Sequence, residues 1–414
     1  MGADSSRAWT VIGIALRFAY SLGLHVRNED PSATAAKRET LVRTWWSLYS
    51  LERTLSVITG RPSTIVDSYC SVPMPIPLPE DSVSGNVEAA YRMRKGSTTI
   101  LSPPSPTYSS SSSVAMELLQ TPATLGAADA NSGSYFKAVV QLSIISQTIL
   151  TSLYSAGTMI RSPGEVQHDM TQLSQRLDQW ILSLPVQFNF QVTHNESSDQ
   201  FARERLLLAI QLCSARILLT RPCLSGRRQI LREASFARRM ANNCIEAAKT
   251  IVAFLPDEFC PEVIYNQGPW WCIIHHTMQA VSVFLLGLSY PSSTSHDSTM
   301  LVHDLKKAIR WLQSSQDPVA VRASHVALNT FESVARGCSL DVSDLWTGGT
   351  GEGVAIRGHN VQNTVSDTGM VAYLPAHFVT MAAPPIVDPA LATHAAYNAV
   401  IAGGPLNETY YMAR

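Results

Sequence analysis

The sequence has little charge for its length. Asp, Glu, Lys and Arg make up 15% of the 414 residues, against about 25% in an ordinary globular protein. Apolar residues make up 45%, so the shortage of charge predicts a large buried core together with long neutral segments. The net charge is −1 at pH 7, whereas a domain that binds nucleic acid directly is usually clearly basic. The balance argues against phosphate binding by the bulk surface and leaves DNA binding by a separate module open.

Paired cysteines and long apolar runs are also missing. The seven cysteines are scattered, and no two of them are spaced as C-x-x-C. This spacing argues against a zinc cluster, and an odd number in so long a chain argues against a secreted disulfide framework. We therefore expect reduced thiols in a nuclear or cytosolic compartment. No run of 18 apolar residues occurs, so we expect no transmembrane helix.

Strand signals are nearly absent, and helical periodicity dominates instead. No Asn-Gly turn joins two alternating runs, while apolar residues recur every three or four positions along much of the chain. Pro62 is expected to stop the second helix, and alternating prolines should keep residues 71–79 extended. The pattern predicts an all-α protein with helices over residues 8–24, 36–59, 135–160, 167–185, 201–222, 227–255, 269–288, 297–314 and 317–336.

Two segments lack the composition of a packed core. Ten of the thirteen residues from 101 to 113 are Ser or Pro, which predicts a disordered insertion over about residues 82–133. Residues 341–414 are rich in Gly, Ala, Pro and Thr with weak periodicity, so we expect a C-terminal tail of low order. Residues 5–340 are then one large multi-helix domain.

Motifs for catalysis or metal binding are missing. His275 and His276 are adjacent in an apolar helix, and no H-x-x-x-H pattern occurs, so structural histidines are favoured over metal ligands. The run GGTGEG (348–353) is not G-x-G-x-x-G and has no strand before it. No nucleophile elbow, P-loop or paired-carboxylate motif is present. We therefore predict that the chain is not an enzyme and holds no cofactor or metal of its own.

A cluster of arginines near residue 230 has two interpretations. On one continuous helix its members span about 140° of arc, at 100° per residue. A solvated face of an amphipathic helix is the favoured interpretation, and a surface for DNA, a nuclear importer or an acidic partner is the alternative. The cluster consists of Arg227, Arg228, Arg232, Arg238 and Arg239.

The stretch LVRTWWSLYSLERTLSVITGRP (41–62) places a carboxylate on an apolar stripe. Glu52 continues the helical series of Trp45 and Leu48, so a buried Glu52 must be neutral or paired. Arg53 lies about 100° round the helix and is a poor partner, whereas Arg17 or Arg61 is a better one. We therefore favour a structural ion pair over a catalytic carboxylate, because no second acid or nucleophile accompanies it.

Together, AWTVIGIALRFAYSLGLH, RTWWSLYSLERTLSVITGRP and SVPMP resemble the fungal-specific transcription factor domain, the middle homology region of fungal zinc-cluster transcription factors. That family pairs R-x-W-W with an Asp/Glu-Arg dipeptide, then G-R-P and V-P-x-P, and the resemblance extends over roughly residues 5–340. The signature positions, which we interpret as architectural, are Arg17, Arg43, Trp45, Trp46, Glu52, Arg53, Gly60, Arg61 and Pro62.

The resemblance implies a nuclear regulatory domain that controls transcription by RNA polymerase II. It implies protein partners such as a corepressor, a coactivator or a second copy, or a small-molecule effector, and no membrane. The family binds DNA through an N-terminal six-cysteine module that holds zinc, and no residue of this chain matches that module. The chain is thus expected to be truncated, or to be a regulator that has lost its DNA-binding half. The alternatives are a DNA-binding-deficient interaction protein and an all-α enzyme with an apolar pocket.

Overall fold

The structure is a computed structural model that describes residues 2–83, 87–97, 130–155, 161–190, 200–224, 234–256, 270–289, 295–338, 340 and 342–345. This part of the chain consists of α-helices, short 3₁₀ turns and loops, with no strand, so the all-α prediction is confirmed. The helices are α1 (Gly2–Ser21), α2 (Ala35–Thr59), α3 (Val87–Ser97), α5 (Ser132–Tyr154), α6 (Pro163–Leu182), α7 (Ala202–Thr220), α8 (Ala234–Ala253), α10 (Trp270–Ser289), α11 (Ser295–Gln313) and α12 (Pro318–Cys338).

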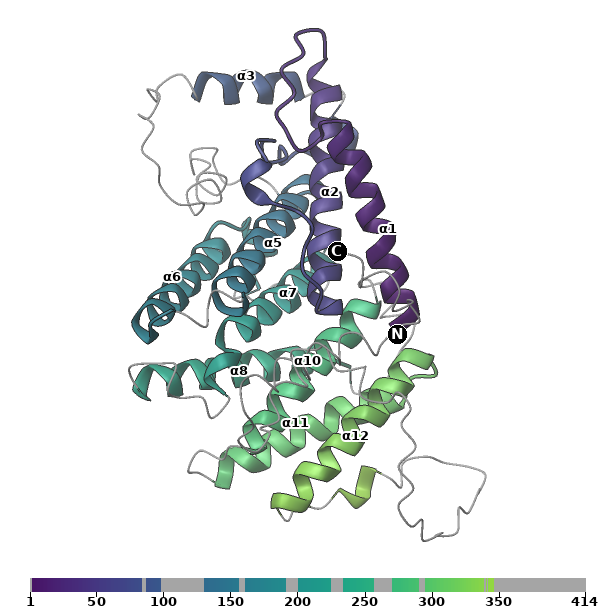
Figure 1. Cartoon of the computed structure of the whole chain (residues 1–414), viewed down its shortest axis with the longest axis vertical. Helices are drawn as coiled ribbons and strands as arrows, with labels where there is room; N and C mark the ends of the chain where they lie inside the picture. Colours follow the sequence, from purple (N-terminus) through teal and green to yellow (C-terminus); the bar gives the residue numbers. More distant parts are fainter. Residues whose placement is uncertain are drawn as a thin grey trace, which may run out of the picture.

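Helices α1 and α2 lie side by side and enclose a core with the loop that follows them (Figure 1). The Thr34 hydroxyl caps the start of α2 by accepting from the Lys37 N–H. The helix ends at Gly60, whose φ of 66° is left-handed and whose N–H bonds back to the last turn. The expectation that Pro62 ends α2 was wrong, because the Gly60 cap terminates the helix two residues earlier. Residues 71–79 lie outside regular secondary structure, as the prolines predict.

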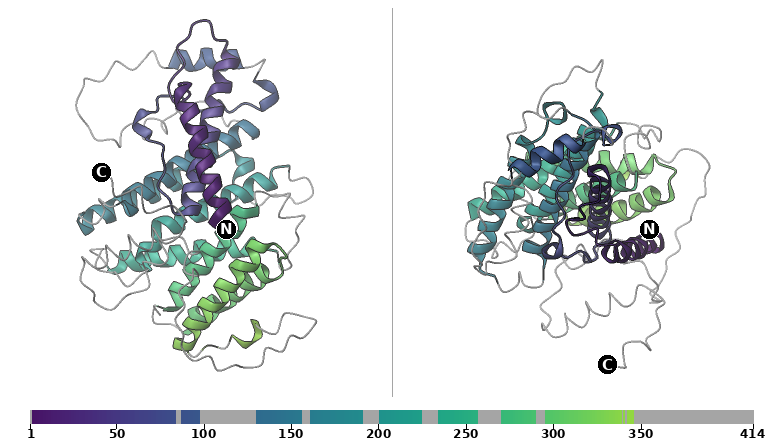
Figure 2. Two further views of the ribbon diagram at one scale, coloured as in Figure 1. Left: turned by 45° about the vertical axis from the view of Figure 1, so that its right-hand side comes forward. Right: turned by 90° about the horizontal axis from the view of Figure 1, so that it is seen from above.

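The remaining helices build two further cores below the first (Figure 2). One core is shared by α5, α6 and α7, and the other by α7, α8, α10, α11 and α12. Helix α5 contributes to the first and second cores and α7 to the second and third. Such helices are apolar all round because they pack on two sides.

This packing explains an apparent membrane signal. By length and composition alone, the helices Ser132–Tyr154, Ala202–Cys223 and Cys272–Ser289 are apolar enough to cross a membrane. In the folded protein, the most apolar stretch of Ala202–Cys223 is 72% buried and that of Cys272–Ser289 is 67% buried. The corresponding stretch of Ser132–Tyr154 is 39% buried. The buried apolar residues of these helices therefore pack in the shared cores. The search for 18 consecutive apolar residues missed these helices because polar residues interrupt each of them.

Two segments expected to lack order contain structure. Residues Val87–Ser97 form α3, and the buried Val87 packs with Ala35 and Ile76. At the other end, Ser343–Leu345 form a 3₁₀ turn with Leu345 buried in the third core. Disorder was therefore wrongly predicted for these short pieces, because each places one apolar residue in a core. The Ser/Pro stretch (101–113) and residues 346–414 lie outside the described residues.

Candidate functional site

Two signature residues, Arg43 and Trp46, lie where α2 meets the proline-rich segment 71–79. The Ile76 N–H donates to Glu39 Oε1 over 2.9 Å. Arg43 Nη2 donates to the carbonyls of Ile76 (3.1 Å) and Leu78 (2.8 Å), and Arg43 Nε bonds Glu39 Oε1 at 3.0 Å. A proline-rich segment has few N–H groups of its own, so its carbonyls need external donors. Arg43 and the buried Glu39 therefore clamp this segment to α2.

The two adjacent tryptophans have separate tasks. Trp46 Nε1 donates to the Pro73 carbonyl over 2.8 Å, which adds a third anchor for the same segment. Trp45 is fully buried, and its ring lies 5.4 Å from the ring of Tyr20 and 5.8 Å from that of His25. Edge-to-face contacts of this kind stabilise packing beyond the buried area alone. One tryptophan thus holds the loop, and the other joins α1 to α2.

Glu52 is buried, as the apolar stripe predicts, with 1% of its surface exposed. Its carboxylate accepts hydrogen bonds from Ser63 Oγ (2.7 Å), the Thr64 N–H (2.8 Å), Thr64 Oγ1 (3.3 Å) and Ser56 Oγ (3.2 Å). Three of these donors come from the loop that follows the Gly60 cap. The loop thus supplies enough donors to hold a buried carboxylate in place.

The arginine partners predicted for Glu52 were wrong. Arg17 is exposed on α1, and the guanidinium of Arg61 lies over the Trp9 ring, 5.0 Å from its centroid. Pro62 is exposed in the loop. The physical reason is that hydroxyl and backbone donors of the loop reach Glu52 directly, so its carboxylate is satisfied without a direct bond to an arginine.

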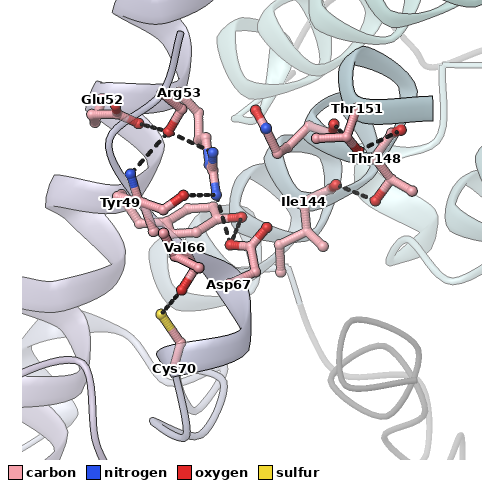
Figure 3. Close-up of polar contacts among 12 residues, drawn as sticks. Tyr49, Glu52, Arg53, Val66, Asp67, Cys70, Ile144, Thr148 and Thr151 are labelled. Atoms are coloured by element: carbon pink, nitrogen blue, oxygen red, sulfur yellow. Dashed lines mark hydrogen bonds and ion pairs between the residues drawn. The ribbon is translucent and has the colours of Figure 1, made fainter. Parts of the chain in front are cut away.

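The structural ion pair of this region belongs to Arg53. Its Nη2 lies 2.6 Å from Asp67 Oδ1, its Nη1 donates to Ser63 Oγ, and its guanidinium covers the Tyr49 ring at 4.7 Å (Figure 3). The Tyr49 hydroxyl donates to the same Asp67 oxygen over 3.0 Å. Burial acts to lower the pKa of Arg53, but Tyr49 and Asp67 outweigh it and the pKa is raised. Ser63 links this pair to Glu52 because it accepts from one and donates to the other.

This network offers no reacting group. Burial raises the pKa of the neighbouring Cys70 thiol to about 12, which leaves it a poor nucleophile at neutral pH. In the part of the chain that the structure describes, no group of three or more His, Cys, Asp or Glu side chains is placed to hold a metal. The contacts around Glu52 and Arg53 therefore fix the loop to α2.

The predicted arginine cluster lies only partly within the described residues. Arg238 and Arg239 are exposed on α8, with Arg239 over the Phe236 ring at 5.3 Å. Arg227, Arg228 and Arg232 lie outside the described residues, so the basic surface stays a prediction.

The histidine pair lies within the helical core. Burial lowers the pKa of His275 to about 3 and that of His276 to about 4. Gln279 lies between the His276 ring (3.5 Å) and the Ser214 hydroxyl of α7, which donates to it over 2.8 Å. Both imidazoles are thus neutral, and they are polar members of the packing between α7 and α10.

Sequence reasoning missed several members of this site. Glu39 carried a usable signal, because it lies four residues before Arg43 and therefore on the same helix face. Asp67 and Ser63 could not be identified from the sequence, because a loop has no periodicity that would place their side chains against α2. Tyr49 looked like one more apolar residue of the helix stripe.

The network around α2 lies within a region that matches a family model. Residues 1–182 match the family model described as the fungal specific transcription factor domain. Residues 1–182 are therefore similar to the fungal specific transcription factor domain. The match ends at the last residue of α6, so extension of the domain to residue 340 stays a prediction.

Curated relatives of this fungal transcription factor domain are regulators of transcription. The transcription regulator galc of Aspergillus niger is 27% identical over 391 residues, which cover 83% of this chain and 46% of that protein. The transcriptional regulatory protein C3C7.04 of Schizosaccharomyces pombe is 24% identical over 60% of this chain and 26% of its own length. The thiamine repressible genes regulatory protein thi1 of the same yeast is 34% identical over 21% of this chain and 11% of its own length.

The matched region spans less than half the length of each of these relatives. No solved structure is significantly similar to the chain.

Proposed function

We propose that the chain is the regulatory domain of a fungal zinc-cluster-type transcription factor and controls transcription by RNA polymerase II in the nucleus. The observation that carries this proposal is the family match over α1 to α6, which contains the whole Arg43–Asp67 network. In that network, Arg43, Trp46 and Arg53 each hold a later segment of the chain against α2. The domain therefore regulates through its folded surface, and we assign it no catalytic activity.

Contact with DNA belongs, in this proposal, to a zinc-cluster module outside residues 1–414. The seven cysteines of this chain include no C-x-x-C pair, and the five whose side chains the structure describes are free thiols, four of them buried. A zinc cluster needs thiolates that converge on the metal. Zinc is therefore assigned to the separate module and to no residue of this chain.

A reporter assay tests the regulatory role. Residues 1–414 would be fused to an unrelated DNA-binding domain in a fungal strain with a matching reporter gene. We expect reporter transcription to differ from that with the DNA-binding domain alone, and an Arg53→Ala fusion to lose the difference because the α2 network is broken. Leu182→Ser, at an exposed residue, is the matched control. An intact nuclear fusion with no effect on the reporter would contradict the proposal.

Mapping the 5′ end of the native transcript tests the assignment of DNA binding. Upstream codons for a six-cysteine cluster would support a DNA-binding factor. A translation start at Met1 would instead support the alternative, an interaction protein that acts by titrating partners.

A further inference from the structure

Helix α1 has two apolar faces, and α2 covers one of them. Leu16 and Ala19 are buried in the first core, and Ile12 is buried on the same side of the helix. On another side, at spacings of three, four and four residues, lies what we call the α1 stripe. It consists of Val11, Ile14, Phe18 and Leu22, whose exposed fractions are 63%, 46%, 66% and 75%. At 100° per residue these four span an arc of roughly 80°.

The α1 stripe is unusual for a helix face that no described residue covers. Single exposed apolar residues are common, but aligned ones mark interaction surfaces. Among the described helices, α2 is the one that packs extensively along α1, and α1 lies at the outer edge of the molecule (Figures 1 and 2). A helix that is apolar on two sides is expected to be covered on both.

One exposed arginine lies beside the stripe. Arg17 is about 60° round the helix from Ile14, and its guanidinium makes no hydrogen bond or ion pair with the described residues. The two acidic residues of α2, Glu39 and Glu52, are buried and already bonded. This face therefore combines an apolar stripe with one arginine that lacks a partner among the described residues.

We propose that the α1 stripe docks an amphipathic helix of another protein whose own apolar stripe is flanked by Asp and Glu. Helix spacing along α1 suits ridge-into-groove packing by a second helix, and Arg17 supplies complementary charge at the edge. The inference rests on the proposed function, since a regulator that acts through its surface needs a partner. It also explains Arg17, a signature residue that the α2 network does not use.

Two other occupants fit the observations less well. Two copies of the α1 stripe facing each other would pair two faces that each have the exposed Arg17 at the edge, which supplies no complementary charge. A membrane-surface helix has a broad apolar face and many cations on its polar face, whereas the α1 stripe is narrow and has one arginine at its edge. We therefore choose the acidic helix and treat the other two as outcomes of the test.

Peptide binding to the full chain tests the proposal. The probe is a labelled synthetic helix of 18 residues with Leu on one face and Glu elsewhere, and its matched control has Lys in place of every Glu. By fluorescence anisotropy we expect the acidic peptide to bind at least about tenfold more tightly than the basic one. Phe18→Ser with Leu22→Ser should abolish binding, while Leu182→Ser with Val186→Ser, also at exposed positions, should not. Arg17→Glu should reverse the preference between the two peptides.

Several results would overturn the proposal. These are equal binding of both peptides, binding that survives the Phe18/Leu22 change, a stable homodimer that this change dissociates, or binding to anionic vesicles that the acidic peptide does not displace. Thermal melting checks that each variant is folded, and Arg17→Glu alone suffices if the double variant is not. A reporter effect without peptide binding would reject the docking surface and leave the proposed function standing.

Discussion

Two neighbouring charges on α2 are buried for different reasons. Glu52 and Arg53 are 1% and 3% exposed, yet the loop satisfies each separately. Glu52 accepts from hydroxyl and backbone donors, and Arg53 pairs with Asp67. A buried charge is tolerated only when its partners replace the lost water. At the scale of single residues, the signature therefore describes how one loop is fastened to one helix.

Replacing Glu52 by Gln tests this account. The Gln side chain turns an amide N–H₂ toward donors at Ser63 or Thr64, so at least one donor loses its acceptor. We expect a loss of about 2 kcal/mol in the free energy of unfolding, measured by chemical denaturation. Glu29→Gln, at an exposed residue, should change it by less than about 0.5 kcal/mol. Equal stabilities of the Glu52 and Glu29 variants would show that these hydrogen bonds contribute little.

At the scale of elements, the start of α5 is pressed against the proline-rich segment. Asn131 caps the helix with a reciprocal bond to Ser134, and its Nδ2 also donates to the Pro77 carbonyl. A Cβ added at Gly133 would overlap the backbone of Leu78. The segment that Arg43 clamps on one side is thus closed on the other by a helix terminus that only glycine allows.

Glycine substitutions distinguish this close approach from a simple turn. Gly60→Ala should cost about 1 kcal/mol, because it places a Cβ at a left-handed position. Gly133→Ala should cost more, about 3 kcal/mol, because backbone has to move. Gly13→Ala, in a helix interior with open space around it, should stabilise by about 0.5–1 kcal/mol. Thermal melting gives the order, and a harmless Gly133 variant would contradict the tight contact.

The last described turn is held to the third core by one apolar and one charged side chain. Leu345 is buried in that core, and the Asp344 carboxylate accepts from Lys306 Nζ over 2.7 Å and from Arg310. Lys306 lowers the pKa of Asp344, with Arg310 adding to the effect. The turn therefore behaves as part of the helical domain.

Leu345→Ala should lower the free energy of unfolding by about 2–3 kcal/mol, since it leaves a cavity in the third core. Asp344→Asn should cost less than about 1 kcal/mol, because its partners are partly exposed to water. Urea denaturation of the two variants gives the comparison. If Leu345→Ala has no larger effect than Leu182→Ala at an exposed position, the turn does not contribute to the core.

At the scale of the whole molecule, three cores are joined by helices that belong to two of them. Helices α5 and α7 transmit any displacement from one core to the next, because close-packed interiors have few voids to absorb it. The buried polar group of Ser214, His276 and Gln279 lies at such a junction, between α7 and α10.

The histidines at this junction predict how stability depends on pH. Their folded-state pKa values of about 3 and about 4 lie below the value of about 6.5 for a free histidine. As pH falls below about 6.5, the unfolded chain takes up protons that the folded protein does not, so stability is full above that pH and declines toward pH 4. The expected loss is on the order of 1–2 kcal/mol per histidine by pH 5.

Unfolding at pH 7 and pH 5 measures this loss. A variant with His275 and His276 both changed to Gln should lose less stability between the two pH values than the wild type. His303→Gln, at an exposed histidine, is the control and should behave as the wild type does. Identical pH dependence of all three proteins would mean that the pKa values of His275 and His276 are not lowered in the folded state.

The local pattern of apolar residues in the sequence determined much of the secondary structure of this protein. Periodicity of three and four residues fixes helices over most of the described chain, because each helix buries one or two apolar sides. The same pattern showed that Glu52 is buried and that Arg53 is not its partner. The family signature was readable for a similar reason, since its tryptophans, arginines and glycine occur at fixed spacing in and directly after one helix.

Only the tertiary structure decided which groups meet. The partners of Glu52 and Arg53 come from a loop, and loops have no repeat from which side-chain direction follows. The ordered turn at Leu345 depends on one apolar residue finding a core far away in sequence, which composition averaged over the tail conceals. The exposed α1 stripe was likewise invisible in the sequence, because a second apolar face looks the same whether it is covered or not. Periodicity records which faces are apolar, and packing alone determines what each face touches.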